Sequence, residues 1–282
     1  MPVPVPKTYK LFVGGKFPRS ESGRSFQPTG NPAINVARGS RKDLRDAVVA
    51  ARAGLVAWSG HSAYLRGQIL YRLAEMLETR RAAMQDELRT GGATAAAAKK
   101  ELDVAISLVT WYAGLSDKVQ SLLGSQNAVN GPFFNFSTVE PSGVVGVIAP
   151  DAPALVGVLA LVLPLLVSGN AVVALVSETA PFAGLALGEA CASSDVPGGA
   201  LNLLSGHRAE LASQFAAHRD VDGLLVAGRP DAALTVAAAD NCKRVRYCDR
   251  SVAEWSNAEG LRSLALVEPF VECKTLWHPV AW

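Results

Sequence analysis

The sequence predicts an α/β protein built on a doubly wound parallel sheet, and three observations support this prediction. Residues 144–149 and 171–176 are continuous apolar runs rich in β-branched side chains, which is typical of strands buried on both faces. A longer apolar segment, 152–167, lies between them and suits a crossover helix. Short apolar runs then alternate with helical segments as far as residue 247.

The segment from Gly143 to Val176 also has a membrane interpretation, because Asp151 is the only charged residue within it. A helix that spans a bilayer needs about 20 apolar residues. The uninterrupted apolar core here is shorter, and it contains Pro153 and Pro164. A buried crossover helix is therefore the favoured interpretation, and no membrane association is predicted.

Helices are expected before this core. Ser40 followed by Asp43 resembles a capping box at a helix start, and an apolar stripe of helical period continues from there. Helical patterns follow over residues 64–81 and, in a long Ala-rich run, over residues 93–123. The sequence therefore predicts a group of N-terminal helices.

Strand and helix patterns alternate through the rest of the chain. Residues 133–140 alternate apolar and polar side chains, as a solvent-facing strand does. After the core, the expected elements are a helix over 181–193, a strand over 200–204, a helix over 207–217, a strand over 222–226, a helix over 230–240 and a strand over 243–247. Five strands with interleaved helices predict a Rossmann-type sheet. Residues 249–262 are charged and turn-like, and residues 264–277 give a last strand candidate.

The composition of the chain excludes some classes of function. The chain has 282 residues and is 49% hydrophobic, so it can bury a large core. Its net charge of +2 is dispersed, without a basic stripe interleaved with aromatic residues, so no nucleic-acid binding is expected. The first residues lack the apolar core of a signal peptide, which predicts a cytoplasmic protein.

The positions of the cysteines and histidines indicate structural roles rather than catalysis or metal binding. Their spacing matches no metal-ligand pattern, so no metal site is predicted. Cys191 and Cys242 are expected on the buried faces of helices, and His207 as an exposed residue at a helix start. Cys248, which closes a strand, has a redox or catalytic interpretation, but packing is favoured.

Several phrases of the sequence resemble the aldehyde dehydrogenase superfamily. They are LFVGGKFPRSESGRSF, WYAGLSDKVQ, EPSGVVGVIAP, SGNAVV with the SET that follows it, VPGGALNLLSG and HRDVDGLLVAG, and they span roughly residues 9–247. Residues 270–279, FVECKTLWHP, resemble the family's C-terminal strand, which belongs to a small oligomerisation sheet in those enzymes. Family members carry a catalytic domain, on the order of 200 residues, where this chain has only residues 249–262.

The resemblance implies an aldehyde dehydrogenase-like fold with N-terminal helices and a small oligomerisation sheet, but without the catalytic domain. The expected parts are an N-terminal and cofactor-type domain over 1–248, which includes an arm strand at 133–140, a connector over 249–263 in place of the catalytic domain, and an oligomerisation tail strand over 264–282. Trp277 and Trp282 in the tail suit a subunit interface. A monomer that folds the tail onto itself is the alternative.

The chain departs from the family pattern where the catalytic residues belong. The nucleophilic cysteine lies in the absent domain, and no cysteine of this chain lies in a corresponding motif. The general-base glutamate, expected in a Leu-Gly-Gly-Lys context, is replaced by the run Arg246 to Arg250. The oxyanion-stabilising asparagine of a Pro-Trp-Asn-Phe-Pro turn is replaced by Pro150-Asp151-Ala152-Pro153. No catalytic residue is therefore predicted.

The cofactor motifs are only partly retained. The family's ribose-binding lysine aligns with Leu175, whereas Ser177 and Glu178 survive, and Glu178 keeps a carboxylate for a ribose hydroxyl. The pyrophosphate turn Gly-Ser-Thr becomes Gly228-Arg229-Pro230, in which proline removes a backbone donor but arginine adds a charge that suits a phosphate. The vestigial cofactor-binding residues are therefore Ser177, Glu178 and Gly228, with no cofactor expected and NAD or NADP as the alternative.

The sequence predicts a non-catalytic subunit with a structural or regulatory role, and we do not expect aldehyde oxidation by this chain alone. Its expected partner is a second copy of itself or a full-length aldehyde dehydrogenase, because an unpaired arm sheet would expose an open strand edge. The alternative is an NAD(P)-binding oxidoreductase component or dinucleotide sensor whose catalytic cysteine is supplied in trans. A decaying gene product without a function is a third interpretation.

Overall fold

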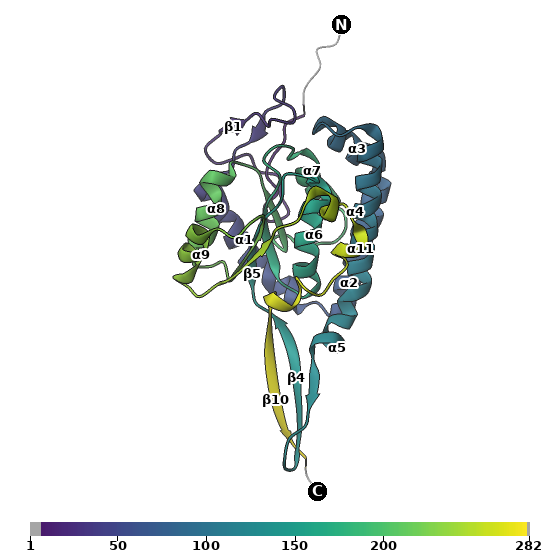
Figure 1. Cartoon of the computed structure of the whole chain (residues 1–282), viewed down its shortest axis with the longest axis vertical. Coiled ribbons are helices and arrows are strands. Elements are labelled where there is room, and N and C mark those ends of the chain that lie inside the picture. The colour runs from purple at the N-terminus through teal and green to yellow at the C-terminus, as the bar shows by residue number, and fades with distance from the viewer. Residues whose placement is uncertain (1–6, 281–282) are drawn as a thin grey trace.

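The computed structural model describes residues 7–280 of the chain. Its body is a parallel sheet with helices on both faces, and a narrow arm of three strands extends from one end (Figure 1). The Pro-rich start of the chain and Trp282 lie outside the described residues.

Five strands form the central sheet in the order β7-β6-β5-β8-β9, and every neighbouring pair is parallel. They are β5 (Val144–Ile148), β6 (Ala171–Leu175), β7 (Leu201–Leu204), β8 (Gly223–Ala227) and β9 (Arg244–Cys248). The chain reverses its direction of travel across the sheet between β7 and β8, so β5 and β8 flank the switch point, beside which such sheets bind ligands. The predicted doubly wound α/β fold is confirmed.

Helices connect the strands and cover both faces. The crossover helices are α6 (Ala154–Val167), α7 (Phe182–Ala192), α8 (Arg208–Ala217) and α9 (Ala232–Ala239). Every residue of α6 from Leu155 to Val167 is buried, so this helix has to be enclosed on all sides. Among residues 7–280, none of the helices combines the length and the hydrophobicity that a membrane span requires.

The N-terminal helices complete the two layers. They are α1 (Arg41–Gly60), α2 (Ala63–Thr79), α3 (Arg81–Thr90), α4 (Ala95–Leu115) and α5 (Val119–Leu123), and a short two-stranded sheet, β1 (Ser25–Phe26) with β2 (Val36–Ala37), precedes them. The predicted capping box at Ser40 and Asp43 is present at the start of α1. The helix predicted over residues 93–123 is interrupted, because a 3₁₀ turn at Ser116–Lys118 separates α4 from α5.

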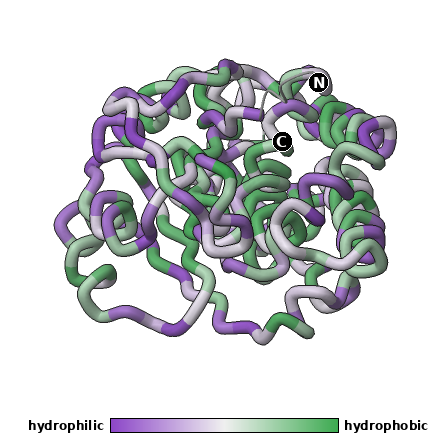
Figure 2. The backbone as a smooth tube through the Cα atoms, turned by 90° about the horizontal axis from the view of Figure 1, so that it is seen from above, coloured by the Kyte–Doolittle hydropathy of each residue, from purple (hydrophilic) through white to green (hydrophobic). Residues whose placement is uncertain are grey.

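The hydrophobic core has one cluster on each face of the sheet. Helices α2, α4 and α7 contact α6 on one face, and α1 contacts α8 and the strands β5, β6 and β7 on the other. Figure 2 shows the hydrophobic backbone segments gathered in the middle of the molecule and the hydrophilic ones around its rim. The carboxyl ends of the strands are thus fixed between two packed helical layers.

The segment between β9 and the last strand is more ordered than the sequence predicted. It contains two short helices, α10 (Val252–Trp255) and α11 (Ala258–Leu261), and a 3₁₀ turn at Glu268–Phe270. Helix α10 contacts α6 and α11 contacts α4, so that Trp255 and Leu261 are buried. Val267 and Phe270, nearer the last strand, are also fully buried, so apolar side chains anchor the segment along its length.

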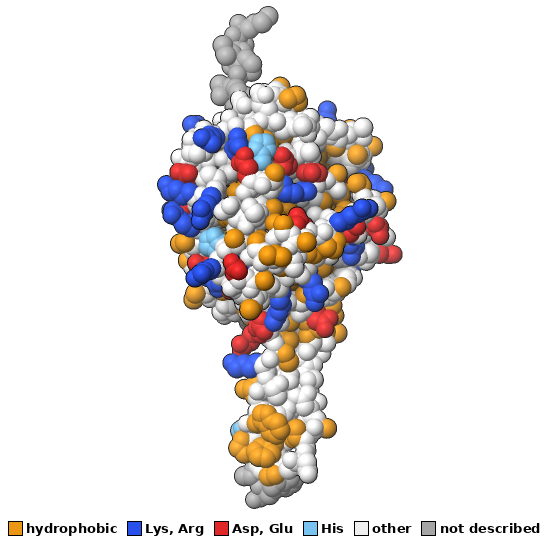
Figure 3. Space-filling view, turned by 60° about the vertical axis from the view of Figure 1, so that its left-hand side comes forward, with side chains coloured by type: hydrophobic (Ala, Val, Ile, Leu, Met, Phe, Trp, Pro, Cys, Tyr) orange, Lys and Arg blue, Asp and Glu red, His pale blue; other side chains and the backbone are white. Residues whose placement is uncertain are grey.

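The arm is an antiparallel sheet in the order β10-β4-β3. Its strands are β3 (Ser125–Asn127), β4 (Phe133–Pro141) and β10 (Val271–Pro279), with Val271 opposite Pro141 and Pro279 opposite Phe133. The last strand begins at Val271 rather than at residue 264, because the 3₁₀ turn around Pro269 precedes it. Exposed hydrophobic side chains gather towards the end of the arm (Figure 3), and we call Phe133, Phe134, Leu276 and Trp277 the arm patch.

The structure separates the two cysteines that were expected to pack on helices. Cys191 is buried in α7, as predicted. The prediction for Cys242 is wrong, because α9 ends at Ala239 and the exposed Cys242 lies in a turn with a φ of 56°. The Ala-rich sequence before it has helical character, but Asp240 and Asn241 end the helix.

We expect Trp255→Ala to lower the free energy of unfolding by about 3–5 kcal/mol, because it empties a buried site between α10 and α6. Val252→Ala, in the same helix but 57% exposed, is the matched control and should change it by no more than about 0.5 kcal/mol. Urea unfolding of both variants measures the difference. Equal, small effects would mean that the connector is not part of the core.

Candidate functional site

The predicted cofactor residues lie at the carboxyl edge of the central sheet. Ser177 and Glu178 follow β6, Asp151 follows β5, and Gly228 follows β8. The structure brings the first three together through hydrogen bonds, whereas Gly228 lies across β5 from β6. This edge is the place where doubly wound sheets bind small molecules.

Both carboxylate oxygens of Glu178 are bound by its own chain. Oε1 lies 2.8 Å from Nδ1 of His207, and Oε2 accepts the backbone N–H of Arg208 at 2.8 Å. Arg208 is the first residue of α8, where a negative charge is favourable. Glu178 therefore acts as a cap for α8. The prediction of an exposed His207 missed this pair, in which the His207 side chain is 34% exposed.

Ser177 and Asp151 hold the turn after β6. The hydroxyl of Ser177 donates to the backbone carbonyl of Asp151 at 3.0 Å and accepts the N–H of Ala180 at 2.9 Å. Oδ1 of Asp151 accepts the N–H of Glu178 at 2.8 Å. Ser177 is almost fully buried, so its hydroxyl is committed to this turn.

Arg208, which follows β7, also contacts residues at this edge of the sheet. Its Nη2 donates to the carbonyl of Ala149 at 2.5 Å and lies 3.7 Å from Oδ1 of Asp151. The side chain thus crosses the end of β6 to reach the end of β5. No local pattern in the sequence predicts this role of Arg208, since only the order of the strands brings it next to Ala149. The four charged or polar side chains of Asp151, Glu178, His207 and Arg208 form what we call the edge cluster.

The polar groups of the turn after β8 are also bound by other groups of the same chain. Gly228 has a φ of 117°, and its N–H donates to the carbonyl of Cys248 at 2.9 Å. The side chain of Arg229 is 89% exposed and lies 3.5 Å from Asp249. The carboxylate of Asp231 caps α9 by accepting the N–H of Ala233 at 2.8 Å and that of Leu234 at 3.3 Å.

Asp231 is a site residue that sequence reasoning missed, although a signal for it exists. An aspartate directly before an Ala-rich helical run is a typical N-cap. Its carboxylate occupies the end of α9 at which an anion would otherwise bind. The start of this helix therefore carries a negative charge of the protein itself.

Cys248 is buried at the end of β9, in agreement with the packing interpretation. Burial raises the pKa of its thiol, and the nearby Arg250 lowers it to a smaller extent. A buried thiol with a raised pKa is a weak nucleophile, because the reactive species is the thiolate. Across residues 7–280, no group of three His, Cys, Asp or Glu side chains is arranged to hold a metal ion.

Residues 18–248 match the aldehyde dehydrogenase family. This chain belongs to that family. Human retinal dehydrogenase 2 is 31% identical to it over 262 residues, which are 87% of this chain and 50% of that protein. Cytosolic aldehyde dehydrogenase 1 of Elephantulus edwardii is 30% identical over 249 residues, with 84% and 49% covered. This aldehyde dehydrogenase family member thus spans about half the length of the curated relatives it matches.

Solved aldehyde dehydrogenases have the same fold. A putative enzyme from Burkholderia cenocepacia superposes with a TM-score of 0.80 at 26% identity, covering 85% of this chain and 50% of that one. PnpE from Pseudomonas sp. WBC-3 gives 0.80 at 24% identity, with 86% and 50% covered. Betaine aldehyde dehydrogenase from Staphylococcus aureus gives 0.77 at 23% identity, with 84% and 49% covered. The predicted family and fold are confirmed.

We expect iodoacetamide at neutral pH to modify Cys242 and Cys273 in the folded protein well before Cys191 and Cys248. The first two are exposed, whereas the other two are buried and burial raises the pKa of both thiols. Mass spectrometry of the peptides measures the order, and protein unfolded in urea, in which all four should react, is the control. Rapid labelling of Cys248 in the folded protein would contradict the assignment of a packing role.

Proposed function

We propose that this chain is a non-catalytic subunit of the aldehyde dehydrogenase family, a pseudoenzyme with a structural or regulatory role. The observation that supports this proposal most strongly is the edge cluster. Its charged groups bind one another and the backbone, so the edge that would hold a cofactor is already filled by hydrogen bonds of the chain itself.

The contacts at this edge do not fit a dinucleotide. PnpE and the S. aureus betaine aldehyde dehydrogenase have been solved in complex with NAD. A pyrophosphate at the start of α9 would need free backbone N–H groups. Here the N–H of Gly228 is bound to Cys248, Pro230 has no N–H, and the carboxylate of Asp231 would repel a phosphate. A ribose at Glu178 would have to displace the cap of α8.

Residues 249–263, the connector, also support a non-catalytic role. We propose that residues 249–263 stand in place of the catalytic domain and that the chain contains no catalytic nucleophile. The connector packs its own Trp255 and Leu261 onto the layer of α4 and α6. This leaves the described part of the chain with a closed hydrophobic core that needs no second domain.

The arm suits assembly with a second copy of the chain or with a full-length aldehyde dehydrogenase. Within residues 7–280, β10 pairs only with β4, so its other edge is open to another strand. The arm patch adds aromatic side chains, of which Trp277 is 60% exposed and Phe133 42%. Their rings are 5.6 Å apart in an edge-to-face arrangement, so the patch is already ordered for contact with a partner.

A dinucleotide-binding component or sensor is the second candidate, and Arg229 is the residue that favours it. Its guanidinium is exposed and only loosely paired with Asp249, so it is free to turn towards a phosphate. The nucleophile would then come from another chain. A measurement of NAD and NADP binding to the folded protein separates the two candidates.

We expect NAD and NADP at millimolar concentration to leave the melting temperature of the protein unchanged. A ligand that binds only the folded state must raise the melting temperature, so an unchanged value reports the absence of binding. A full-length aldehyde dehydrogenase treated in the same way is the positive control. A rise of several degrees that disappears in Arg229→Gln would contradict the scaffold proposal and favour the sensor.

A further inference from the structure

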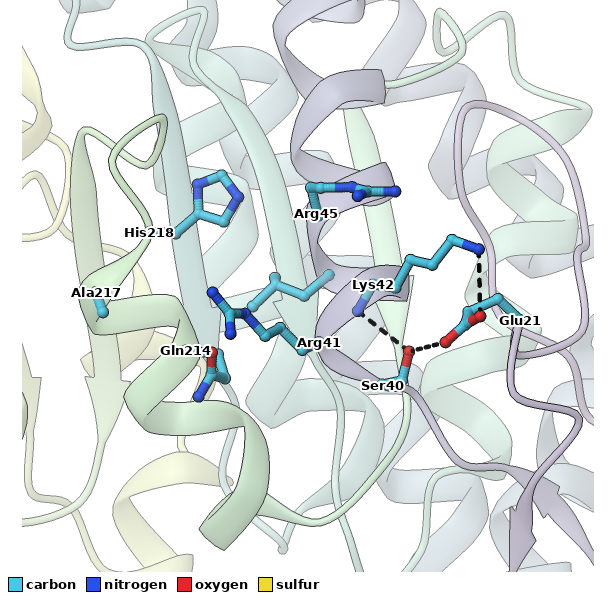
Figure 4. A pocket seen from close by; sticks show the side chains of 9 residues that line it. Glu21, Ser40, Arg41, Lys42, Arg45, Gln214, Ala217 and His218 are labelled. Carbon is cyan, nitrogen blue, oxygen red and sulfur yellow. Dashed lines mark hydrogen bonds and ion pairs between the residues drawn. The ribbon is translucent and has the colours of Figure 1, made fainter.

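A second group of charged side chains lies in a cavity between α1 and α8 (Figure 4). The cavity has a volume of about 510 Å³, which is within the range of small-molecule sites. None of its lining residues belongs to the edge cluster, although Glu21 and His218 fall within two of the phrases that resemble the family, LFVGGKFPRSESGRSF and HRDVDGLLVAG, and Ser40 is the cap of α1. It therefore has to be explained separately from the cofactor edge.

The lining carries an excess of positive charge. Arg41, Lys42 and Arg45 come from the first turns of α1, whereas Glu21 is the only acidic residue that lines the cavity. Lys42 lies 3.3 Å from Glu21 and is neutralised by it. Arg45 pairs with its neighbour Asp46 at 2.9 Å, but both side chains are at least half exposed and such a pair contributes little.

Arg41 is the cation that remains unpaired. Among the described residues, no acidic side chain lies within ion-pair distance of it. Figure 4 shows its side chain extending from α1 towards α8, where Gln214 and His218 lie, while Lys42 points the other way to Glu21. The backbone N–H groups at the start of α1 are already bound within the capping box of Ser40 and Asp43, so the positive charge offered to the cavity comes from side chains.

The side chains beside Arg41 add hydrogen-bond donors. Nδ1 of His218 accepts the N–H of Asp220 at 3.2 Å, so in the neutral ring the proton resides on Nε2, which is then a donor. Gln214 contributes an amide that can also donate. A cavity lined by a free guanidinium, an imidazole donor and an amide suits an anion that has several acceptor oxygens.

We propose that this cavity binds a phosphate group, either as inorganic phosphate or as the phosphate of a small phosphomonoester. The planar guanidinium of Arg41 matches two phosphate oxygens, whereas Arg45 extends towards the side of Lys42 in Figure 4 and would have to leave Asp46 and turn to reach the same anion. The volume leaves room for an organic group beside the phosphate. This site does not depend on the non-catalytic role proposed above.

The surroundings of His218 make the binding sensitive to pH. Burial lowers its pKa, and so do the positive charges of Lys243 before β9 and of Arg41 and Arg52 on α1, whereas Asp220 raises it. A bound phosphate would add negative charge and raise this pKa. Phosphate itself changes from a dianion to a monoanion near its second pKa of about 6, so the clear expectation is an upward movement of the pKa of His218 when phosphate is bound.

The first test is a calorimetric titration in chloride buffer with inorganic phosphate and, separately, with glycerol phosphate. We expect saturable binding at one site, and Arg41→Gln should weaken it roughly ten-fold or more, because a charged hydrogen-bonding partner is lost. Tighter binding of the ester than of inorganic phosphate would assign the site to an organic phosphate, and the reverse order to the free ion. Since Arg41 is exposed, its variant should retain the melting temperature of the wild type.

Two matched variants control for other arginines. Arg89→Gln removes an exposed helical arginine that pairs with Asp86 at 3.1 Å, much as Arg45 pairs with Asp46, and it should leave the affinity unchanged. Arg229→Gln tests whether phosphate binds at the cofactor edge instead. The absence of saturable binding, an equal loss in Arg89→Gln, or a loss in Arg229→Gln but not in Arg41→Gln would each overturn the proposal.

An NMR titration of His218 provides a readout at the site itself. In the wild type, saturating phosphate should move the pKa of His218 upward, and Arg41→Gln should reduce this movement at the same phosphate concentration. His61, which does not line the cavity, is the internal control and should not respond. An identical pKa of His218 with and without phosphate would overturn the assignment.

Discussion

The complete burial of α6 is the constraint on which the rest of the structure depends. A helix without a polar face can exist in water only if other elements cover it, since each buried Leu or Val side chain contributes about 1.5–3 kcal/mol relative to the exposed state. The sheet covers one side of α6, and α2, α4 and α7 cover much of the rest. The backbone groups at the ends of α6 that have no partner within the helix must also find hydrogen-bond partners.

Side chains from the N-terminal helices form hydrogen bonds with backbone groups at both ends of α6. Glu101 of α4 accepts the N–H groups of Leu155 and Val156 at 2.7 and 3.2 Å, and its burial raises the pKa of the carboxyl group. At the other end, Nε1 of Trp58 donates to the carbonyl of Leu166 at 2.9 Å. The N-terminal helices are therefore integral to the α/β body, and α10 completes the same enclosure.

The order of the helices and strands could be predicted from the sequence, because burial of one face leaves a periodic pattern of apolar residues. Whether the polar groups of the site are free or hydrogen-bonded could not be predicted. The apolar runs of β5 and β6 and the capping box at Ser40 are local signals, and each predicted its element. Whether Glu178 is free or bound depends on how close α8 lies to β6, which no local pattern records. Arg208 and Ala149 meet for the same reason, through the order of the strands. The motif therefore located the site but did not reveal that its groups bind one another.

The proposal that this chain works as a subunit is tested most directly by native mass spectrometry of the protein isolated from its own host. We compare the wild type with Trp277→Ser, which alters only the exposed arm patch, and with Val56→Ser, which removes from α1 an apolar residue that is 76% exposed, against 60% for Trp277. We expect the chain to assemble with itself or with a longer aldehyde dehydrogenase, and this assembly should persist in Val56→Ser and dissociate in Trp277→Ser. A wild-type protein that is monomeric and has no companion would contradict it.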